Sequence, residues 1–350
     1  MTACSDTSST AQPGGPRRAP SHPTTALRST PRLPSSTGDH STSATSYPPI
    51  TDVTGQHGPT STRVSVSSLR KAWPRIAFSV HTLTFQGRRR AYLVAAPDSA
   101  TRSSTLPMTV VLGGWRASAA FEAERTGLLS SVSAGKSVTV YPVSYDESWK
   151  VPGVACCHDA GKTSLDDAGF VAAATRDALA RQPVDRTRSY LVGYSNGGKL
   201  ALALSCTDAD LWAAVATMGA VPQQPCSATT PVSVLLAMGR EDPDQPTDHA
   251  GKPPIPLLEA AAAGYRRRDG CTAGTTVTNP PHAEVTDSRA CSAGTAIRTV
   301  AYDGIGHLWP GEGTVHGEVQ VSAAIALPSL IAQFFAQHRR PTAGSRSVHS

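Results

Sequence analysis

The stretch Gly193–Gly197 reads Gly-Tyr-Ser-Asn-Gly and places one hydroxyl, that of Ser195, between two glycines. An apolar run, Ser189–Val192, precedes it, and a helix-forming run, Lys199–Leu204, follows it. A strand, a sharp turn carrying serine and then a helix make up a nucleophile elbow, in which small neighbours leave room for a strained serine backbone. The pattern predicts that Ser195 is a catalytic nucleophile. The competing interpretation is a glycine-rich turn with a solvated serine.

A serine hydroxyl is a weak nucleophile and needs a histidine base, which in turn needs a carboxylate to orient it. One large class of hydrolases has these groups in the chain order Ser, acid, His, and this chain can meet that order. Asp242 follows an apolar run and is the candidate acid, while its neighbours Glu241 and Asp244 are interpreted as solvated charges. His307 lies in a glycine-flanked segment and is the candidate base, with His316 as a distant second candidate.

Acyl transfer also needs two N–H donors that face the developing oxyanion. The backbone N–H of Asn196, directly after the serine, is one candidate. The other is the backbone N–H of Trp115, in a Gly-Gly-Trp-Arg loop that follows an apolar run. Side chains beside these groups are candidates for the substrate pocket: Trp115, Arg116, Tyr194 and Trp309.

Apolar runs alternate with helical periodicity, which predicts the elements that must position these residues. Strands are predicted at 81–85 and 90–95 as a hairpin, and at 108–112, 137–142, 189–192, 213–217, 232–236 and 297–302. Helices are predicted at 121–132, 164–181 with Ser164 as cap, 257–265 and 327–338. Such alternation implies an α/β fold with a mostly parallel sheet and helices on both faces. Each catalytic candidate follows a strand, so we expect one shared site at the carboxyl edge of the sheet.

Composition divides the chain. Residues 1–71 are rich in Ser, Thr, Pro and Gly and predict a disordered tail or tether, whereas 72–340 predict the catalytic domain and 341–350 a disordered C-terminus. The net charge is +6 and the pI is near 9.0. The tail arginines lack interleaved aromatic residues and a binding motif, so we expect no nucleic-acid partner. Arg88–Arg90 are interpreted as a solvated hairpin end.

Cysteine usage points to an oxidising compartment. Six of the seven cysteines fall in the predicted domain: Cys156, Cys157, Cys206, Cys226, Cys271 and Cys291. An even set suggests disulfides, and Cys206–Cys226 and Cys271–Cys291 are the favoured pairs because each brackets a loop-like segment. Cys156 and Cys157 either form a vicinal bridge or remain thiols. No residues at zinc-site spacing accompany them, so no metal is expected.

The sequence carries neither an apolar signal-peptide core nor an apolar run long enough to span a membrane. The segment Thr2–Cys4, followed by a long polar tether, is similar to the end of a bacterial lipobox. One hypothesis is that Cys4 is lipidated, which would be the protein's only contact with a membrane. The alternative is an incidental cysteine in a tail. We expect an extracellular or envelope-attached protein.

Several segments occur in the order found in the polyhydroxybutyrate depolymerase/feruloyl esterase family, which the chain resembles over residues 78–338: Val111–Gly114, Cys156–Cys157 with Asp166–Asp167, Gly193–Gly198, Gly239–Pro243 and Gly306–Gly311. The resemblance implies an α/β-hydrolase fold and the triad Ser195, Asp242 and His307. The chain departs from the family in two ways. In the oxyanion loop, the family usually has His-Gly where this chain has Gly113–Gly114, and a glycine-rich segment where it has Trp115–Arg116. The Trp115 and Arg116 side chains would narrow the acyl pocket. The second departure is that no polymer-binding module is recognised.

The predicted function is hydrolysis of carboxylic esters of short-chain acyl, hydroxyalkanoate or feruloyl type, through an acyl-enzyme and without a cofactor. Because no polymer-binding module is recognised, small or oligomeric ester substrates are expected, and the protein is expected to be a monomer. Two alternatives stay open. One is an envelope acyltransferase with the same triad, and the other is a non-catalytic surface binding protein on a hydrolase scaffold.

Overall fold

The computed structural model describes residues 65–145, 147–154, 157, 164–226, 230–243, 254–272, 274–311 and 318–340. Its centre is a ten-stranded sheet with the order β1-β2-β4-β3-β5-β6-β7-β10-β9-β8. The strands are β1 (Ile76–Phe85), β2 (Arg88–Pro97), β3 (Leu106–Leu112), β4 (Val138–Pro142), β5 (Val184–Tyr194), β6 (Ala214–Met218), β7 (Ser233–Gly239), β8 (Thr276–Thr278), β9 (Ala283–Ser288) and β10 (Ile297–Tyr302). A small separate pair joins β11 (Trp309–Gly311) and β12 (Glu318–Gln320).

The middle of the sheet is parallel. Strands β4, β3, β5, β6, β7 and β10 run in one direction, while β1 and β2 at one end and β9 and β8 at the other pair in antiparallel fashion. Every residue of β4, β6 and β7 is buried, which is why these strands appear in the sequence as continuous apolar runs. The carboxyl ends of the parallel strands therefore meet at one edge, where loops can converge.

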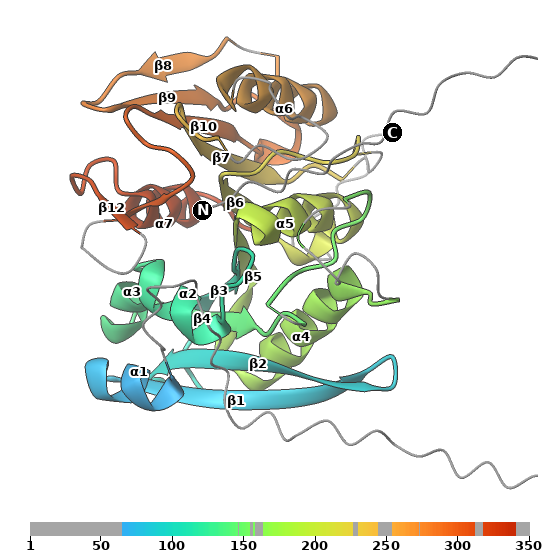
Figure 1. Ribbon diagram of the computed structural model, residues 1–350, viewed down its shortest axis with the longest axis vertical. Coiled ribbons are helices and arrows are strands. Elements are labelled where there is room, and N and C mark those ends of the chain that lie inside the picture. Colours follow the sequence, from blue (N-terminus) through green and yellow to red (C-terminus); the bar gives the residue numbers. More distant parts are fainter. Residues whose placement is uncertain are drawn as a thin grey trace, which may run out of the picture. The chain divides into compact units, whose positions relative to one another are not determined.

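Helices cover both faces of this sheet: α1 (Val66–Ala72), α2 (Ala119–Arg125), α3 (Leu129–Ser133) and α7 (Leu327–Ala336) on one, and α4 (Asp167–Arg181), α5 (Ser195–Thr207) and α6 (Pro254–Arg268) on the other. Figure 1 shows α2, α3 and α7 on one side of the strands and α4, α5 and α6 on the opposite side. Each face has its own buried apolar cluster. Short 3-10 turns lie at Ala209–Leu211 and Ser292–Gly294.

Helix α1 was not predicted, because all of its residues except Ala72 fall in the segment 1–71 that composition assigned to a tail. Ser65 caps it with a capping box, and Leu69 is only 1% exposed within the apolar cluster. The folded domain therefore begins before residue 72. The remaining predicted tail segments, 1–64 and 341–350, lie outside the described residues, as does Cys4.

Two helix details differ from the predictions. The helix predicted over 121–132 is two helices, α2 and α3, because Gly127 adopts a left-handed φ of +70° between them. The predicted cap Ser164 is replaced by Asp166, whose carboxylate accepts a hydrogen bond from the Gly169 N–H at 2.8 Å. A carboxylate at a helix N-terminus also complements the helix dipole, which favours this later start.

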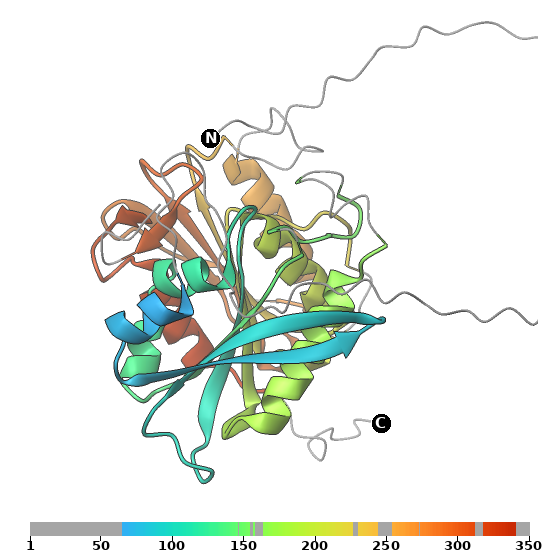
Figure 2. The same cartoon turned by 60° about the horizontal axis from the view of Figure 1, so that its bottom comes forward.

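The β1–β2 hairpin is confirmed and lies at the front of Figure 2. Gln86 and Gly87 form its turn, both at positive φ, which matches the twist of the two strands. The prediction of a solvated arginine end is wrong for Arg90. This side chain is 5% exposed, donates to Asp167 of α4 at 2.7 Å and lies 3.8 Å over the Phe170 ring.

Strands β8 and β9 were not predicted, because β8 has only three residues, all exposed, and the six residues of β9 include Glu284 and Asp287 and form no apolar run. Asp287 of β9 pairs across the sheet with Arg298 of β10 through hydrogen bonds of 2.8 Å to both carboxylate oxygens. Ala283 and Val285 supply the buried side of the same strand. A cross-strand ion pair thus stabilises a strand that lacks an apolar run.

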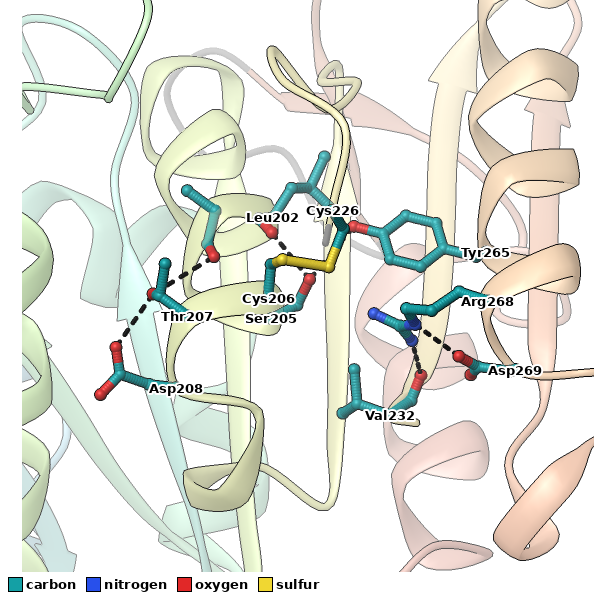
Figure 3. Close-up of a disulfide and its surroundings, with 11 residues drawn as sticks. Leu202, Ser205, Cys206, Thr207, Asp208, Cys226, Val232, Tyr265, Arg268 and Asp269 are labelled. Carbon is teal, nitrogen blue, oxygen red and sulfur yellow. Dashed lines mark hydrogen bonds and ion pairs between the residues drawn. A yellow bond between two sulfur atoms is a disulfide. The ribbon is translucent and has the colours of Figure 1, made fainter. Parts of the chain in front are cut away.

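The two favoured disulfides, Cys206–Cys226 and Cys271–Cys291, are confirmed. Figure 3 shows the first of them joining the end of α5 to the segment after β6, beside Tyr265 of α6. The Tyr265 hydroxyl lies 3.1 Å from Ser205 Oγ, so α5 and α6 are also linked by a hydrogen bond. The vicinal bridge stays a prediction, because Cys156 lies outside the described residues. No described helix has the length and apolar character needed to cross a membrane.

Each disulfide links residues 20 apart, so the entropy of the unfolded chain predicts similar contributions from both. We expect Cys206→Ala/Cys226→Ala to lose about 3 kcal/mol of unfolding free energy, equivalent to a Tm lower by roughly 6–12 °C. Cys271→Ala/Cys291→Ala is the matched comparison and should lose a similar amount. Thermal melts of wild type and both variants, with and without reductant, measure this. Unchanged melting of the variants would contradict the prediction.

Candidate active site

Ser195 lies at the junction of β5 and α5, with a backbone φ of +52°. This conformation is rare for a residue with a side chain. The structure accommodates this conformation because the backbone at Gly193 and Gly197, on either side of Ser195, packs directly against other backbone atoms. A Cβ on Gly193 would lie 2.5 Å from the Gly197 carbonyl oxygen, and one on Gly197 would lie 2.4 Å from that of Leu112 at the end of β3. Both positions therefore require glycine, as predicted for the elbow, because a side chain at either would clash with backbone atoms.

The structure brings the three predicted side chains together. His307 Nε2 lies 2.7 Å from Ser195 Oγ, and His307 Nδ1 lies 2.8 Å from Asp242 Oδ2. Asp242 follows β7 and has no exposed side-chain surface, whereas His307 follows β10 and is 11% exposed. With a proton on Nδ1, the ring donates to the carboxylate and accepts the hydroxyl proton at Nε2. A hydroxyl in this arrangement can be activated as a nucleophile.

The other acidic and histidine residues considered in the sequence analysis are Glu241, Asp244 and His316. Glu241 is exposed to solvent, as predicted for a solvated charge. Asp244 and His316 lie outside the described residues. Among the residues that the structure describes, no group of His, Cys, Asp and Glu is arranged to hold a metal ion.

Two glycines that the sequence analysis did not single out allow the loops to approach. Gly219, just after β6, has a φ of +65°, and a Cβ there would lie 2.8 Å from His307 Cε1 and 3.4 Å from Asp242 Oδ2. A Cβ on Gly239, the last residue of β7, would lie 2.0 Å from the Ile305 carbonyl oxygen. The His307 imidazole therefore occupies space that a side chain at position 219 would fill. The sequence signal that could have pointed to these two positions is a glycine at the end of an apolar run.

The predicted oxyanion loop lies beside the nucleophile. A Cβ on Gly114 would be 3.4 Å from Ser195 Cβ. The Gly114 N–H donates to the buried carboxylate of Glu122 at 3.1 Å, so this donor already has an acceptor within the protein. Trp115 is half-buried and Arg116 is exposed, with its guanidinium 4.5 Å over the Trp115 ring. The donor role of the Trp115 N–H stays a prediction.

Asn196 is the second residue of α5, so its N–H is among those without an acceptor in the helix. Its side chain is 1% exposed and makes two hydrogen bonds to the backbone of Trp149, at 2.7 and 3.1 Å. The Trp149 indole in turn donates to the Gly113 carbonyl at 2.9 Å. Trp149 thus connects the elbow to the oxyanion loop, and no sequence pattern pointed to it.

Two predicted pocket residues are buried beneath the site. Trp309 has no exposed surface and Tyr194 is 8% exposed, with their rings edge to face at 6.1 Å. Burial also raises the pKa of Tyr194 to about 12, and its hydroxyl donates to the His307 carbonyl at 2.7 Å. The assignment of these two residues to an open pocket is therefore wrong, because their apolar rings complete the core instead. They support the histidine loop from below.

Comparisons with known proteins agree with this architecture. A model of the dienelactone hydrolase family matches residues 157–256. The protein named "Putative esterase NocK" from Nocardia uniformis subsp. tsuyamanensis is 27% identical over 253 residues, covering 64% of this chain and 72% of that protein. Acetyl xylan esterase from Aspergillus awamori superposes with a TM-score of 0.53 at 12% identity, covering 74% of this chain and 99% of that structure.

This chain has the α/β-hydrolase fold. The mostly parallel sheet predicted from the alternation of strands and helices and the α/β-hydrolase fold implied by the resemblance are thereby confirmed. The more specific resemblance to polyhydroxybutyrate depolymerases and feruloyl esterases stays a prediction.

Gly219→Ala tests whether the His307 imidazole needs the absence of a side chain at position 219 to reach Ser195. Its Cβ cannot coexist with the observed His307 ring, so the ring must move away from Ser195. We expect the rate at which a fluorophosphonate labels Ser195 to fall by roughly tenfold to a hundredfold, the cost of misplacing a reacting group by about an ångström.

Gly87→Ala is the matched control for backbone strain. Gly87 has a φ of +73° in the hairpin turn, and a Cβ there would meet nothing within 4 Å, so the substitution introduces the strain without the contact. Its labelling rate should stay at the wild-type value. Equal labelling rates for Gly219→Ala and wild type would show that Gly219 does not position the imidazole.

Proposed function

We propose that this protein is a serine esterase that hydrolyses carboxylic esters through an acyl-enzyme. The observation that carries the proposal is the position of His307, which is hydrogen-bonded to Ser195 at 2.7 Å and to Asp242 at 2.8 Å. The dienelactone hydrolase match and the esterase name of the NocK relative support the reaction class. The resemblance to polyhydroxybutyrate depolymerases and feruloyl esterases supports the same three roles.

In the proposed mechanism, Ser195 Oγ attacks the ester carbonyl carbon while His307 Nε2 takes the hydroxyl proton. Asp242 stabilises the imidazolium that forms. The tetrahedral intermediate collapses, the bond to the alcohol oxygen breaks, and His307 returns its proton to that oxygen. A water molecule then attacks the acyl-enzyme with His307 as base, which releases the acid and restores the serine. The backbone N–H groups of Asn196 and Trp115 are proposed to bind the oxyanion.

We propose short-chain, hydroxyalkanoate or feruloyl esters as substrates. The half-buried Trp115 follows Gly114, whose backbone adjoins Ser195, and an indole at this position would narrow the acyl side of the site. The two disulfides are consistent with an extracellular or envelope location, where such bonds persist. A lipid on Cys4 remains part of the localisation proposal.

Ser195→Ala should abolish turnover of p-nitrophenyl acetate, with a loss of about 10³-fold or more in kcat, because the nucleophile is removed. Ser130→Ala, an exposed serine on α3, is the control and should keep the wild-type rate. The assay uses p-nitrophenyl esters from acetate to long chains and one feruloyl ester, and wild type should prefer the short or feruloyl acyl groups. Unchanged turnover by Ser195→Ala would refute the proposal.

The same assay separates the alternatives. Product analysis with an added alcohol acceptor would show ester transfer if the protein is an acyltransferase. Absence of both turnover and fluorophosphonate labelling of Ser195 in wild type would favour a non-catalytic binding protein.

Asp242→Asn tests the carboxylate. The amide can no longer stabilise the imidazolium or hold the required tautomer, so we expect kcat to fall by about 10³- to 10⁴-fold with little change in KM. Glu241→Gln, the exposed neighbour, is the matched control and should leave kcat unchanged. Equal losses in the two variants would assign the effect to the loop rather than to Asp242.

A further inference from the structure

Helix α2 carries an ion pair that the proposed chemistry does not use. Arg125 Nη2 lies 2.5 Å from Glu122 Oε1, and the two side chains are 6% and 1% exposed. Burial disfavours a charged arginine, but the interactions with the Glu122 carboxylate and with Tyr194 together outweigh this and raise the pKa of Arg125. Desolvating two charges costs more than an apolar pair of similar volume would, so stability alone is a weak explanation for a buried ion pair. Its contacts suggest another role.

Glu122 holds the oxyanion loop. Its Oε1 atom accepts the Gly114 N–H at 3.1 Å in addition to the Arg125 guanidinium. The loop lies directly against this side chain, since a Cβ on Gly113 would be 2.5 Å from Glu122 Cγ. The carboxylate therefore restrains the backbone at the residue just before Trp115, the proposed oxyanion donor. A hydrogen bond to a charged acceptor is stronger than one between neutral groups.

Arg125 contacts Tyr194, the residue directly before Ser195. Its guanidinium lies 4.1 Å from the centre of the Tyr194 ring. The Tyr194 hydroxyl donates to the His307 carbonyl at 2.7 Å, and the two rings are 5.2 Å apart. Stacking of a desolvated guanidinium on an aromatic face is favourable and fixes the plane of the ring. The ion pair is therefore connected to both loops that flank the serine.

We propose that Glu122 and Arg125 are positioning residues, Glu122 for the oxyanion loop and Arg125, through Tyr194, for the His307 loop. The inference rests on the proposed esterase function. It explains why α2 buries two charges on the face that packs against the site. It also predicts that removing the pair lowers the rate of the chemical step more than it lowers substrate binding.

The main test replaces both charges at once, as Glu122→Leu/Arg125→Met. Exchange of a buried pair for apolar residues of similar size usually keeps stability, so the variant should fold with a Tm close to that of wild type. We expect kcat for p-nitrophenyl acetate to fall by roughly tenfold to a hundredfold while KM changes by less than about threefold. The affinity for a trifluoromethyl ketone, which forms a tetrahedral adduct with the serine, should fall by the same factor as kcat.

Two single variants keep the proposal testable if the double variant does not fold. Glu122→Gln retains a side-chain oxygen that can accept from Gly114, so it should keep kcat within about threefold of wild type. Tyr194→Phe retains the ring on which Arg125 stacks but removes the hydroxyl that holds His307. It should lower kcat by on the order of tenfold with KM retained.

A second buried ion pair provides the matched control. Arg268, the last residue of α6, and Asp269, the next residue, are 6% and 0% exposed. Arg268 also donates to the carbonyl of Val232, just before β7, as Figure 3 shows. Asp242 follows the opposite end of that strand. Arg268→Met/Asp269→Leu should therefore leave kcat and the ketone affinity unchanged, whatever it does to the Tm.

Fluorophosphonate labelling separates failure of this inference from failure of the proposed function. Labelling reports the reactivity of Ser195 without requiring the correct ester, and it should slow in Glu122→Leu/Arg125→Met by the factor seen in kcat. If wild type labels but hydrolyses no ester, the proposed function fails and the labelling rates still test the inference. Wild-type kcat and labelling in the folded double variant would overturn the inference and leave the esterase proposal intact. A change in KM alone would also overturn it.

Discussion

The left-handed backbone of Ser195 is the constraint on which the site depends. A φ of +52° costs a residue with a side chain about 1–2 kcal/mol, so it persists only where the surroundings enforce it. Here β5 enters from the sheet, α5 leaves at once, and Gly197 packs its backbone against the Leu112 carbonyl. The hydroxyl is thereby held at the carboxyl edge of the parallel strands. The loops after β3, β7 and β10 can all reach it there.

Buried polar side chains hold those loops to the elbow. Asn196 forms hydrogen bonds with the backbone of Trp149, Tyr194 donates to the carbonyl of His307, and Glu122 accepts from the Gly114 N–H. A buried polar group is costly unless it is paired, and an irregular loop offers unpaired backbone groups. Each of these hydrogen bonds therefore gives a partner both to a buried side-chain group and to a backbone group of a loop. These hydrogen bonds hold the irregular loops of the site against the elbow, which is formed by the end of β5 and the start of α5.

The segment that carries Trp149 is held from a second side as well. Asp167, at the start of α4, accepts from the Lys150 N–H at 2.8 Å and from Arg90 of β2 at 2.7 Å. The Arg90 guanidinium rests on the Phe170 ring at 3.8 Å. The β1–β2 hairpin is thus connected through one buried carboxylate to the loop that contacts the elbow. This connection gives a structural reason for the Asp-Asp sequence on which part of the family resemblance rests.

The sequence alone was enough to predict the parallel sheet and the elbow and to name Asp242 and His307 as candidates. These features follow from local periodicity, from glycine spacing and from chain order. The sequence favoured the two disulfide pairs, but only the structure decided the connectivity. Only the tertiary structure decided that Arg90, Glu122 and Arg125 are buried and that Tyr194 and Trp309 lie beneath the site. The environment of a charge or a ring depends on partners distant in the chain, and no local pattern contains them.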